Sequence, residues 1–162
     1  MTSLVALADS YLVQYLDKIE LATAALPDAA LWWRANERSN SIANLVLHLR
    51  GNLSLWILAG LGGEPFDRHR AAEFAARDET PRDELLAALA ATVARCRAVL
   101  ARLAADELDR ERRIQGYAVD GWAALLHAVE HMSYHTGQIV LLAKQLLPPE
   151  VELEFYPQHR DE

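Results

Sequence analysis

The chain has 162 residues, of which 52% are hydrophobic and 24% charged, and its net charge is −7. This length fits one globular core, and the composition is neither disordered nor fibrous. Basic residues are outnumbered and form no long block, which disfavours nucleic acid as a partner. We therefore predict one soluble domain that spans residues 1–162.

Three features bear on where the protein works. The lone cysteine, Cys96, has no intramolecular disulfide partner. The N-terminus lacks the basic head, apolar run and small-residue cleavage site of a signal peptide. No run of about 18 apolar residues is present, as a membrane span requires. We expect a cytoplasmic protein with no membrane partner.

The first half of the chain has two helical patterns. Apolar residues spaced three and four apart predict an amphipathic helix over 3–25. A second helix is predicted from a cap at Asn40 or Ser41 to the glycines at 60–63. Gly51 inside it costs about 1 kcal/mol relative to alanine, which indicates close packing at that point.

The second half begins with a polar, weakly patterned stretch at 63–79, which we interpret as a long connection. The clearest helix follows over 80–108, with Thr80 as its predicted N-cap. A loop or a small hairpin is expected over 109–121, before a last helix over 121–147. Four long helices with one long middle connection predict an all-α four-helix bundle.

The last helix contains the stretch "HAVEHMSYHTGQ", in which three histidines are spaced four residues apart. Because each helical residue advances about 100°, His127, His131, His135 and Gln138 share one stripe. His131 and His135 can therefore direct their rings at a single point, as zinc-binding helices with an H-x-x-x-H pair do. Two ligands hold a transition metal poorly, so a third ligand must come from another helix.

His48 is the natural third ligand, because it interrupts the apolar stretch "ANLVLHLRGN" in the second helix. A buried imidazole needs polar partners, and Asn44 or Asn52, one turn away on either side, could orient its ring. Three imidazoles with an open fourth position are typical of a catalytic metal site. The alternative from spacing alone is a polar seam in which the histidines bond one another or water.

At these residues the chain resembles a known family. "SIANLVLHLRGN" together with "HAVEHMSYHTGQI" is similar to the DinB-like superfamily of bacterial proteins, also described as YfiT-like metal-dependent hydrolases. The resemblance covers nearly the whole chain and implies a homodimer of up-down-down-up four-helix bundles. It also implies a metal triad of His48, His131 and His135 that binds zinc, nickel or another divalent metal. Some relatives transfer low-molecular-weight thiols such as bacillithiol, mycothiol or glutathione.

His127 exceeds the minimal pattern of that family, and it could be a fourth ligand, a proton shuttle or a supporting contact. His127 and His135 lie roughly 12 Å apart along the helix axis, which is too far for both to join one metal with His131. We therefore expect His127 near the metal without binding it. Gln138 is expected near the site, where two roles stay open, helix packing or a contact with a substrate or a metal-bound water, and Asn52 is the third near-site residue.

Other residues carry weaker signals. Glu73 is the best acidic candidate for a general base if the long connection folds over the site, with a solvated loop as the alternative. Cys96 is expected to be buried and uninvolved in catalysis. His69 and His159 lie in polar surroundings and are expected at the surface.

We interpret the chain as a divalent-metal-binding protein that acts as a hydrolase or a thiol S-transferase on a small molecule, with zinc or nickel as the metal. The alternative is a metal-binding stress or interaction protein without turnover. The two hypotheses differ in the site itself. A pocket beside an open coordination position favours the enzyme, whereas a fourth protein ligand that closes the site favours the binding protein.

Overall fold

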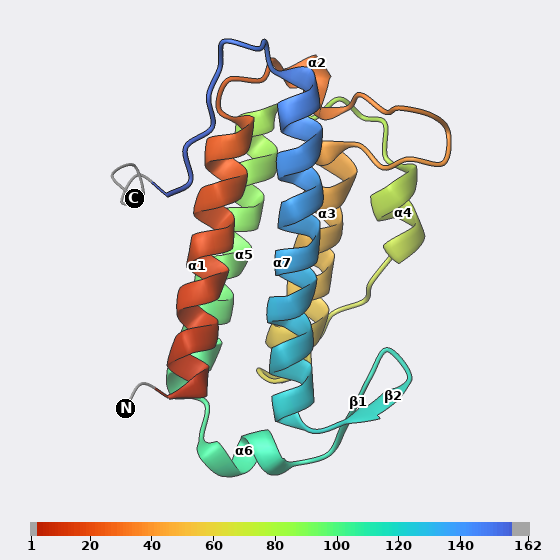
Figure 1. The fold of residues 1–162 in the computed structure, drawn as a ribbon. Coiled ribbons are helices and arrows are strands. Elements are labelled where there is room, and N and C mark those ends of the chain that lie inside the picture. The colour runs from red at the N-terminus through yellow and green to blue at the C-terminus, as the bar shows by residue number, and fades with distance from the viewer. Residues whose placement is uncertain (1–2, 157–162) are drawn as a thin grey trace.

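The computed structural model describes residues 3–156, and four long helices run side by side through them (Figure 1). They are α1 (Leu4–Thr23), α3 (Ile42–Leu53), α5 (Arg82–Arg102) and α7 (Gly121–Leu146). The predicted all-α class is confirmed, while the up-down-down-up course of the chain stays a prediction. His159, expected at the surface, lies outside the described residues.

Short elements complete the two ends and one side of the bundle. They are α2 (Asp28–Leu31), the π-helix η1 (Ser54–Ala59), α4 (Arg70–Ala75), α6 (Ala105–Asp109), β1 (Arg112–Ile114) and β2 (Tyr117–Val119). In Figure 1, α2 lies at one end of the bundle, whereas α6 and the hairpin lie at the other. The α4 segment stands beside α3, within the long connection expected over 63–79.

Each long helix gives its apolar stripe to one shared core. Leu12 of α1, Leu49 of α3 and Leu89 of α5 are fully buried, as is Met132 of α7. These residues belong to a single cluster of buried side chains. At roughly 1.5–3 kcal/mol for each large apolar side chain removed from water, this shared core is the main stabilising contribution to the bundle.

Side-chain caps set the starts of the helices that carry the histidines. The Ser41 hydroxyl accepts from the Asn44 amide of α3 at 3.1 Å, and the Asn44 side chain accepts from the Ser41 N–H at 3.3 Å. This reciprocal pair is a capping box, so the predicted start of the second helix is confirmed. At α7 the Asp120 carboxylate accepts from the Ala123 amide at 2.7 Å.

The helix predicted over 80–108 differs at both ends. Pro81 takes the N-cap position without a side-chain cap bond, so the expected Thr80 cap is wrong by one residue. Acidic residues in the first turn offset the exposed amides there instead. At the other end Leu103 is extended and stops α5, and the separate helix α6 turns Leu108 into the core at 1% exposure.

The second helix continues α3 with a π turn that the apolar pattern does not reveal. In η1 the Gly60 amide donates to the Leu55 carbonyl at 2.9 Å, and the Gly62 amide donates to the Ile57 carbonyl at 2.8 Å. These five-residue steps rotate the helix face relative to an α-helix. Trp56 lies in this segment and is buried at 4% exposure.

The segment between α6 and α7, expected to be a loop or a small hairpin, is a hairpin. Strand β1 pairs antiparallel with β2, with Arg112 opposite Val119 and Ile114 opposite Tyr117. The two turn residues, Gln115 and Gly116, both have positive φ, 54° and 87°. Two such residues fit the tight turn that matches the twist of a hairpin.

One stretch, Ile42–Ala59, is long and apolar enough by length and composition to cross a membrane, with mean hydropathy 1.3 over 18 residues. This stretch corrects the expectation that the chain contains no apolar run of that length. Inside the bundle 78% of the stretch is buried. Burial of this kind is expected of the core helix of a soluble protein, whose apolar face packs on its neighbours.

Candidate metal centre

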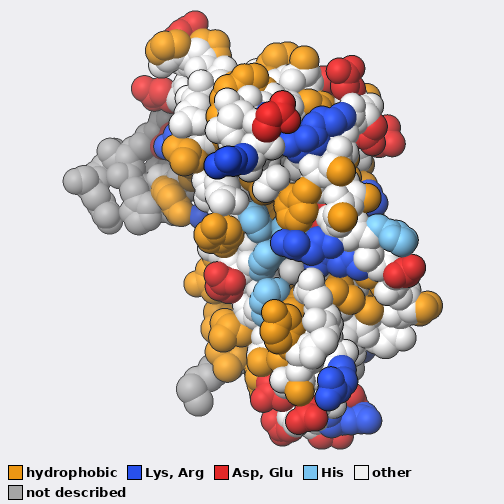
Figure 2. All heavy atoms as spheres, turned by 90° about the vertical axis from the view of Figure 1, so that its right-hand side faces the viewer, with side chains coloured by type: hydrophobic (Ala, Val, Ile, Leu, Met, Phe, Trp, Pro, Cys, Tyr) orange, Lys and Arg blue, Asp and Glu red, His pale blue; other side chains and the backbone are white. Residues whose placement is uncertain are grey.

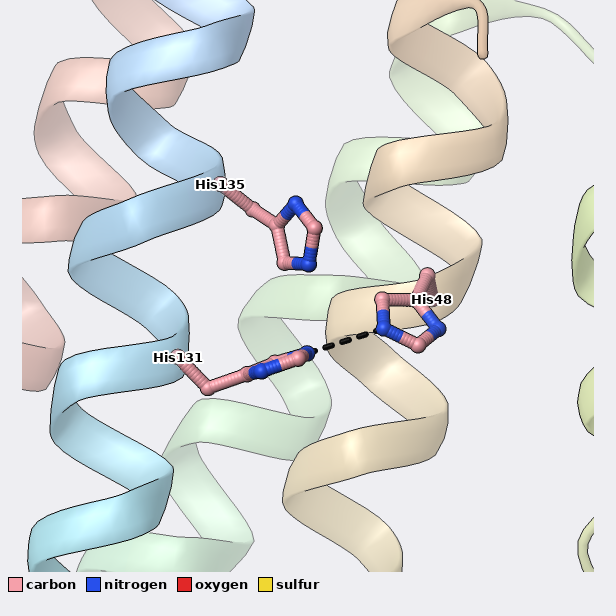
Figure 3. Close-up of side chains that lie close together, drawn as sticks. All are labelled: His48, His131 and His135. Atoms are coloured by element: carbon pink, nitrogen blue, oxygen red, sulfur yellow. Dashed lines mark hydrogen bonds between the residues drawn. The ribbon is translucent and has the colours of Figure 1, made fainter. Parts of the chain in front are cut away.

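Three histidines from two helices meet at the centre of the site. His48 of α3 faces His131 and His135 of α7 across the helix interface (Figure 3). One ring nitrogen from each histidine lies within 4.8 Å of the other two. The Nε2 atoms of His48 and His131 are only 2.8 Å apart. The structure thus brings together the three residues that the sequence proposed as ligands, from positions 83 residues apart.

His48 is held from behind by a charged pair. Its Nδ1 lies 2.8 Å from Glu73 Oε2, and Arg68 donates to both oxygens of the same carboxylate, at 2.8 and 2.9 Å. The side chains of His48, Arg68 and Glu73 are 3%, 6% and 12% exposed. Although burial acts to raise the pKa of Glu73, its hydrogen bonds with His48 and Arg68 hold that pKa below its usual value. The carboxylate therefore stays ionised.

The ionised Glu73 fixes the tautomer of His48. A carboxylate only accepts hydrogen bonds, so the contact at 2.8 Å requires a proton on Nδ1 of His48. Arg68 Nη2 also lies 3.1 Å from that nitrogen, but both atoms carry hydrogens, so this approach is not a hydrogen bond. With Nδ1 protonated, Nε2 of His48 presents its lone pair toward His131 and His135.

Two features of α3 allow Glu73 to reach His48. Gly51 lies three residues after His48, and a Cβ at this position would overlap Glu73 Oε1. The predicted close packing at Gly51 is therefore confirmed. At the start of the same helix, the Asn44 side-chain amide donates to the carbonyl oxygens of Glu73 and Ala76, at 2.9 and 3.2 Å. These bonds fix the α4 segment against α3.

On α7, a neutral group supports His135. Nδ1 of His135 lies 2.6 Å from Gln138 Oε1, so Nδ1 carries the proton and Nε2 is left for a ligand bond. Burial lowers the pKa of His135. Burial and the neighbouring histidines lower the pKa of His131 to about 3. Both rings are therefore neutral near pH 7, which is the form that binds metals.

His127 lies one helical turn before His131 on α7, but its ring contacts other residues. Its Nε2 lies 3.2 Å from Asn52 Nδ2, and its ring packs against the Trp56 ring, tilted by 35° with the centroids 3.9 Å apart. Burial lowers the pKa of His127, so its ring is neutral as well. The structure places it outside the three-histidine group, at 5.2 Å between its centroid and that of His131.

Several residues take roles that differ from the expectation. Within the described residues, neither Asn44 nor Asn52 bonds to His48, so the predicted orientation of its ring by one of them is wrong. Asn44 bonds to the α4 backbone instead, and Glu73 holds the ring. The alternative for Glu73, a solvated loop, is also wrong. Gln138 contacts His135, a role that the sequence reading did not consider.

Two further residues lie where the sequence placed them. Cys96 is fully buried in α5, and burial raises the pKa of its thiol to about 12. A thiol that stays protonated is a poor nucleophile. The side chain of His69 is 79% exposed, beside Asp67, and lies apart from the three-histidine group.

The donor set fits a divalent transition metal. Neutral imidazoles suit zinc, nickel, copper and iron, and ligand nitrogens on a tetrahedral zinc lie about 3.3 Å apart. The Nε2 atoms of His48 and His131 are 2.8 Å apart, and all three ligand nitrogens lie within 4.8 Å of one another, which is the scale of one coordination sphere. The carboxylate behind His48 is the support that metal-bound histidines usually have.

A pocket of about 630 Å³ opens beside the histidines. His48, His131 and His127 form one side of it, and Trp56, Arg70 and Tyr117 are among the residues of the other walls. In Figure 2 the histidines form a pale blue column on this face, with basic side chains beside it. The volume lies within the range of small-molecule sites, so a ligand has access to the edge of the centre.

The fold is shared with known structures. Three solved structures of similar fold cover most of the chain, and two of them are described as DinB-like proteins. The one from Bacillus subtilis is 24% identical with a TM-score of 0.68, over 93% of this chain and 96% of that one. The one from Bacillus cereus is 16% identical with a TM-score of 0.70, over 93% and 99%. A conserved protein from Enterococcus faecalis is 18% identical with a TM-score of 0.74, over 90% and 98%.

Residues 2–154 match the model of a family described as a protein of unknown function, DUF1572. The chain belongs to this family, and its fold is similar to that of the two DinB-like structures. No curated protein matches the chain. The helical fold that the resemblance in "SIANLVLHLRGN" and "HAVEHMSYHTGQI" implies is thus shared with structures described as DinB-like.

Proposed function

We propose that His48, His131 and His135 hold one divalent transition metal, and that the protein uses it as a hydrolase or a thiol S-transferase. The observation that carries this proposal is the convergence of three imidazoles at the edge of a pocket of about 630 Å³. A structural site would instead have a fourth protein ligand. A bound divalent metal supplies Lewis acidity, which lowers the pKa of a water or a thiol.

The residues around the centre have different roles. Glu73 keeps the proton on Nδ1 of His48, and Gln138 does the same for His135, so both rings keep their ligand orientation. His127 lines the pocket as a neutral ring and is suited to accept a proton from the reacting group. Trp56 packs against His127 and lines the same pocket.

Elemental analysis after purification without added metal tests the centre. We expect about one transition metal per chain, and we expect His48→Ala, His131→Ala and His135→Ala each to abolish it. His127→Ala should retain most of the metal, and the exposed His69→Ala is the matched control. Full occupancy in any of the three centre variants, with helix content unchanged by circular dichroism, would contradict the proposal.

The non-catalytic alternative differs in whether the metal has an exchangeable position. Cobalt(II) in place of the native metal gives a visible spectrum that reports its coordination. We expect the spectrum to change when a small thiol is added, because a position faces the pocket. An unchanged spectrum at saturating thiol would favour a closed, non-catalytic centre. Homodimerisation and a cytoplasmic location stay predictions.

A further inference from the structure

The pocket beside the histidines has an unusual charge for this chain. Its lining includes Arg68 and Arg70 and, among the described residues, no aspartate or glutamate. The chain as a whole carries a net charge of −7. A cleft lined by one sign of charge concentrates ligands of the opposite sign. The pocket is therefore suited to an anion, although the protein is acidic.

The two arginines are not equivalent. The charge of Arg68 is offset by Glu73, with which it forms a buried two-point ion pair. Arg70 forms no ion pair within residues 3–156, and its guanidinium lies over the Phe74 ring at 4.9 Å. Arg70 is exposed, so its donors face solvent and are available to a ligand. An unpaired guanidinium can bind a carboxylate through two parallel hydrogen bonds.

The rest of the pocket wall is largely apolar. Trp56, Val119 and Ala123 line it, and Tyr117 projects from strand β2 at 64% exposure. An exposed tyrosine on a rigid hairpin provides a flat surface at little entropic cost, because its side chain has few rotatable bonds. The pocket thus offers an aromatic and aliphatic surface between a cationic group and the histidine centre.

We propose that this pocket binds a small organic carboxylate, with the carboxylate on Arg70 and the apolar part between Trp56 and Tyr117. This inference rests on the proposed function and specifies its substrate class, because the same pocket borders the metal centre. Arg70 is a specificity-determining residue, and Tyr117 forms the outer wall. The reacting end of the ligand lies toward His131.

Isothermal titration calorimetry with two matched probes tests the inference. The probes are 3-phenylpropionate and 3-phenylpropionamide, which differ only in the charge of the carboxylate end. Each is titrated into the protein with and without a divalent metal. We expect the carboxylate to bind at least about tenfold more tightly, since hydrogen bonds to charged groups are the stronger ones. Arg70→Gln should abolish this preference, and Arg70→Lys should retain part of it.

Arg50→Gln is the matched control, because Arg50 is exposed on α3 and does not line this pocket. It should keep the full preference. Equal binding of the two probes, no binding of either, or a preference that survives Arg70→Gln would overturn the inference. If the preference that survives Arg70→Gln also requires the metal, then the metal holds the carboxylate.

The two proposals fail separately. If elemental analysis finds no metal but the metal-free protein keeps an Arg70-dependent preference, the anion site stands and the proposed metal centre falls. If the metal is present and the two probes bind equally, the metal centre stands and the anion site falls.

Discussion

The two helices that supply the histidines support them in opposite ways. On α3, His48 is buried and rests against the ionised Glu73, which is itself paired with Arg68. On α7, His135 rests against the neutral Gln138 of its own helix. An imidazole that donates a hydrogen bond to a carboxylate is more basic than one that donates to a neutral amide. It therefore binds a metal more strongly through its other nitrogen. The α3 side should therefore contribute more to metal affinity.

The largest expected effect comes from Glu73→Gln, which keeps the shape of the side chain and removes its charge. We expect metal affinity to fall by about 10- to 100-fold, the usual effect of losing the group that supports a metal-bound histidine. Competition with a chromophoric chelator measures the affinity. Glu20→Gln, at an exposed position on α1, controls for the change in net charge. Unchanged affinity in Glu73→Gln would mean that the two sides do not differ.

Gly51→Ala tests the same support without touching a polar group. The added methyl group overlaps Glu73 Oε1, so the carboxylate must move away from His48. We expect metal affinity to fall by about tenfold. The free energy of unfolding should stay level or fall by about 1–2 kcal/mol, because the lost bond between Glu73 and His48 outweighs the roughly 1 kcal/mol by which alanine favours a helix over glycine. Chelator competition and urea unfolding measure the two quantities.

Gly137→Ala is the matched control, because it is also helical and a Cβ there meets no heavy atom within 4 Å. It should gain stability without losing affinity for the metal. If Gly51→Ala binds metal as the wild type does, Glu73 has room to move while it keeps its bond to His48.

The same two regions differ in how far the sequence could predict them. His131, His135 and Gln138 share one helix, whose period alone fixes which side chains lie on the same face. His48 followed from an imidazole in an apolar stretch. Glu73 meets His48 from 25 residues away, through a polar connection without a period, so no local pattern encodes the contact. Its signal was indirect, because Gly51 in an apolar helix indicated a close neighbour without naming it.

The smallest expected effects come from substitutions of Gln138. One of them should lower metal affinity and the other should raise it. Gln138→Ala removes one neutral hydrogen bond from His135, so metal affinity should fall only about fivefold. Gln138→Glu gives His135 the kind of charged acceptor that His48 has, so affinity should rise by a similar factor. The same substitutions at the exposed Gln145 of α7 are the controls, and chelator competition is the measurement. If Gln138→Glu weakens binding as Gln138→Ala does, then the charge of the acceptor does not explain the difference between the two helices, and the geometry of Glu73 and Arg68 must explain it.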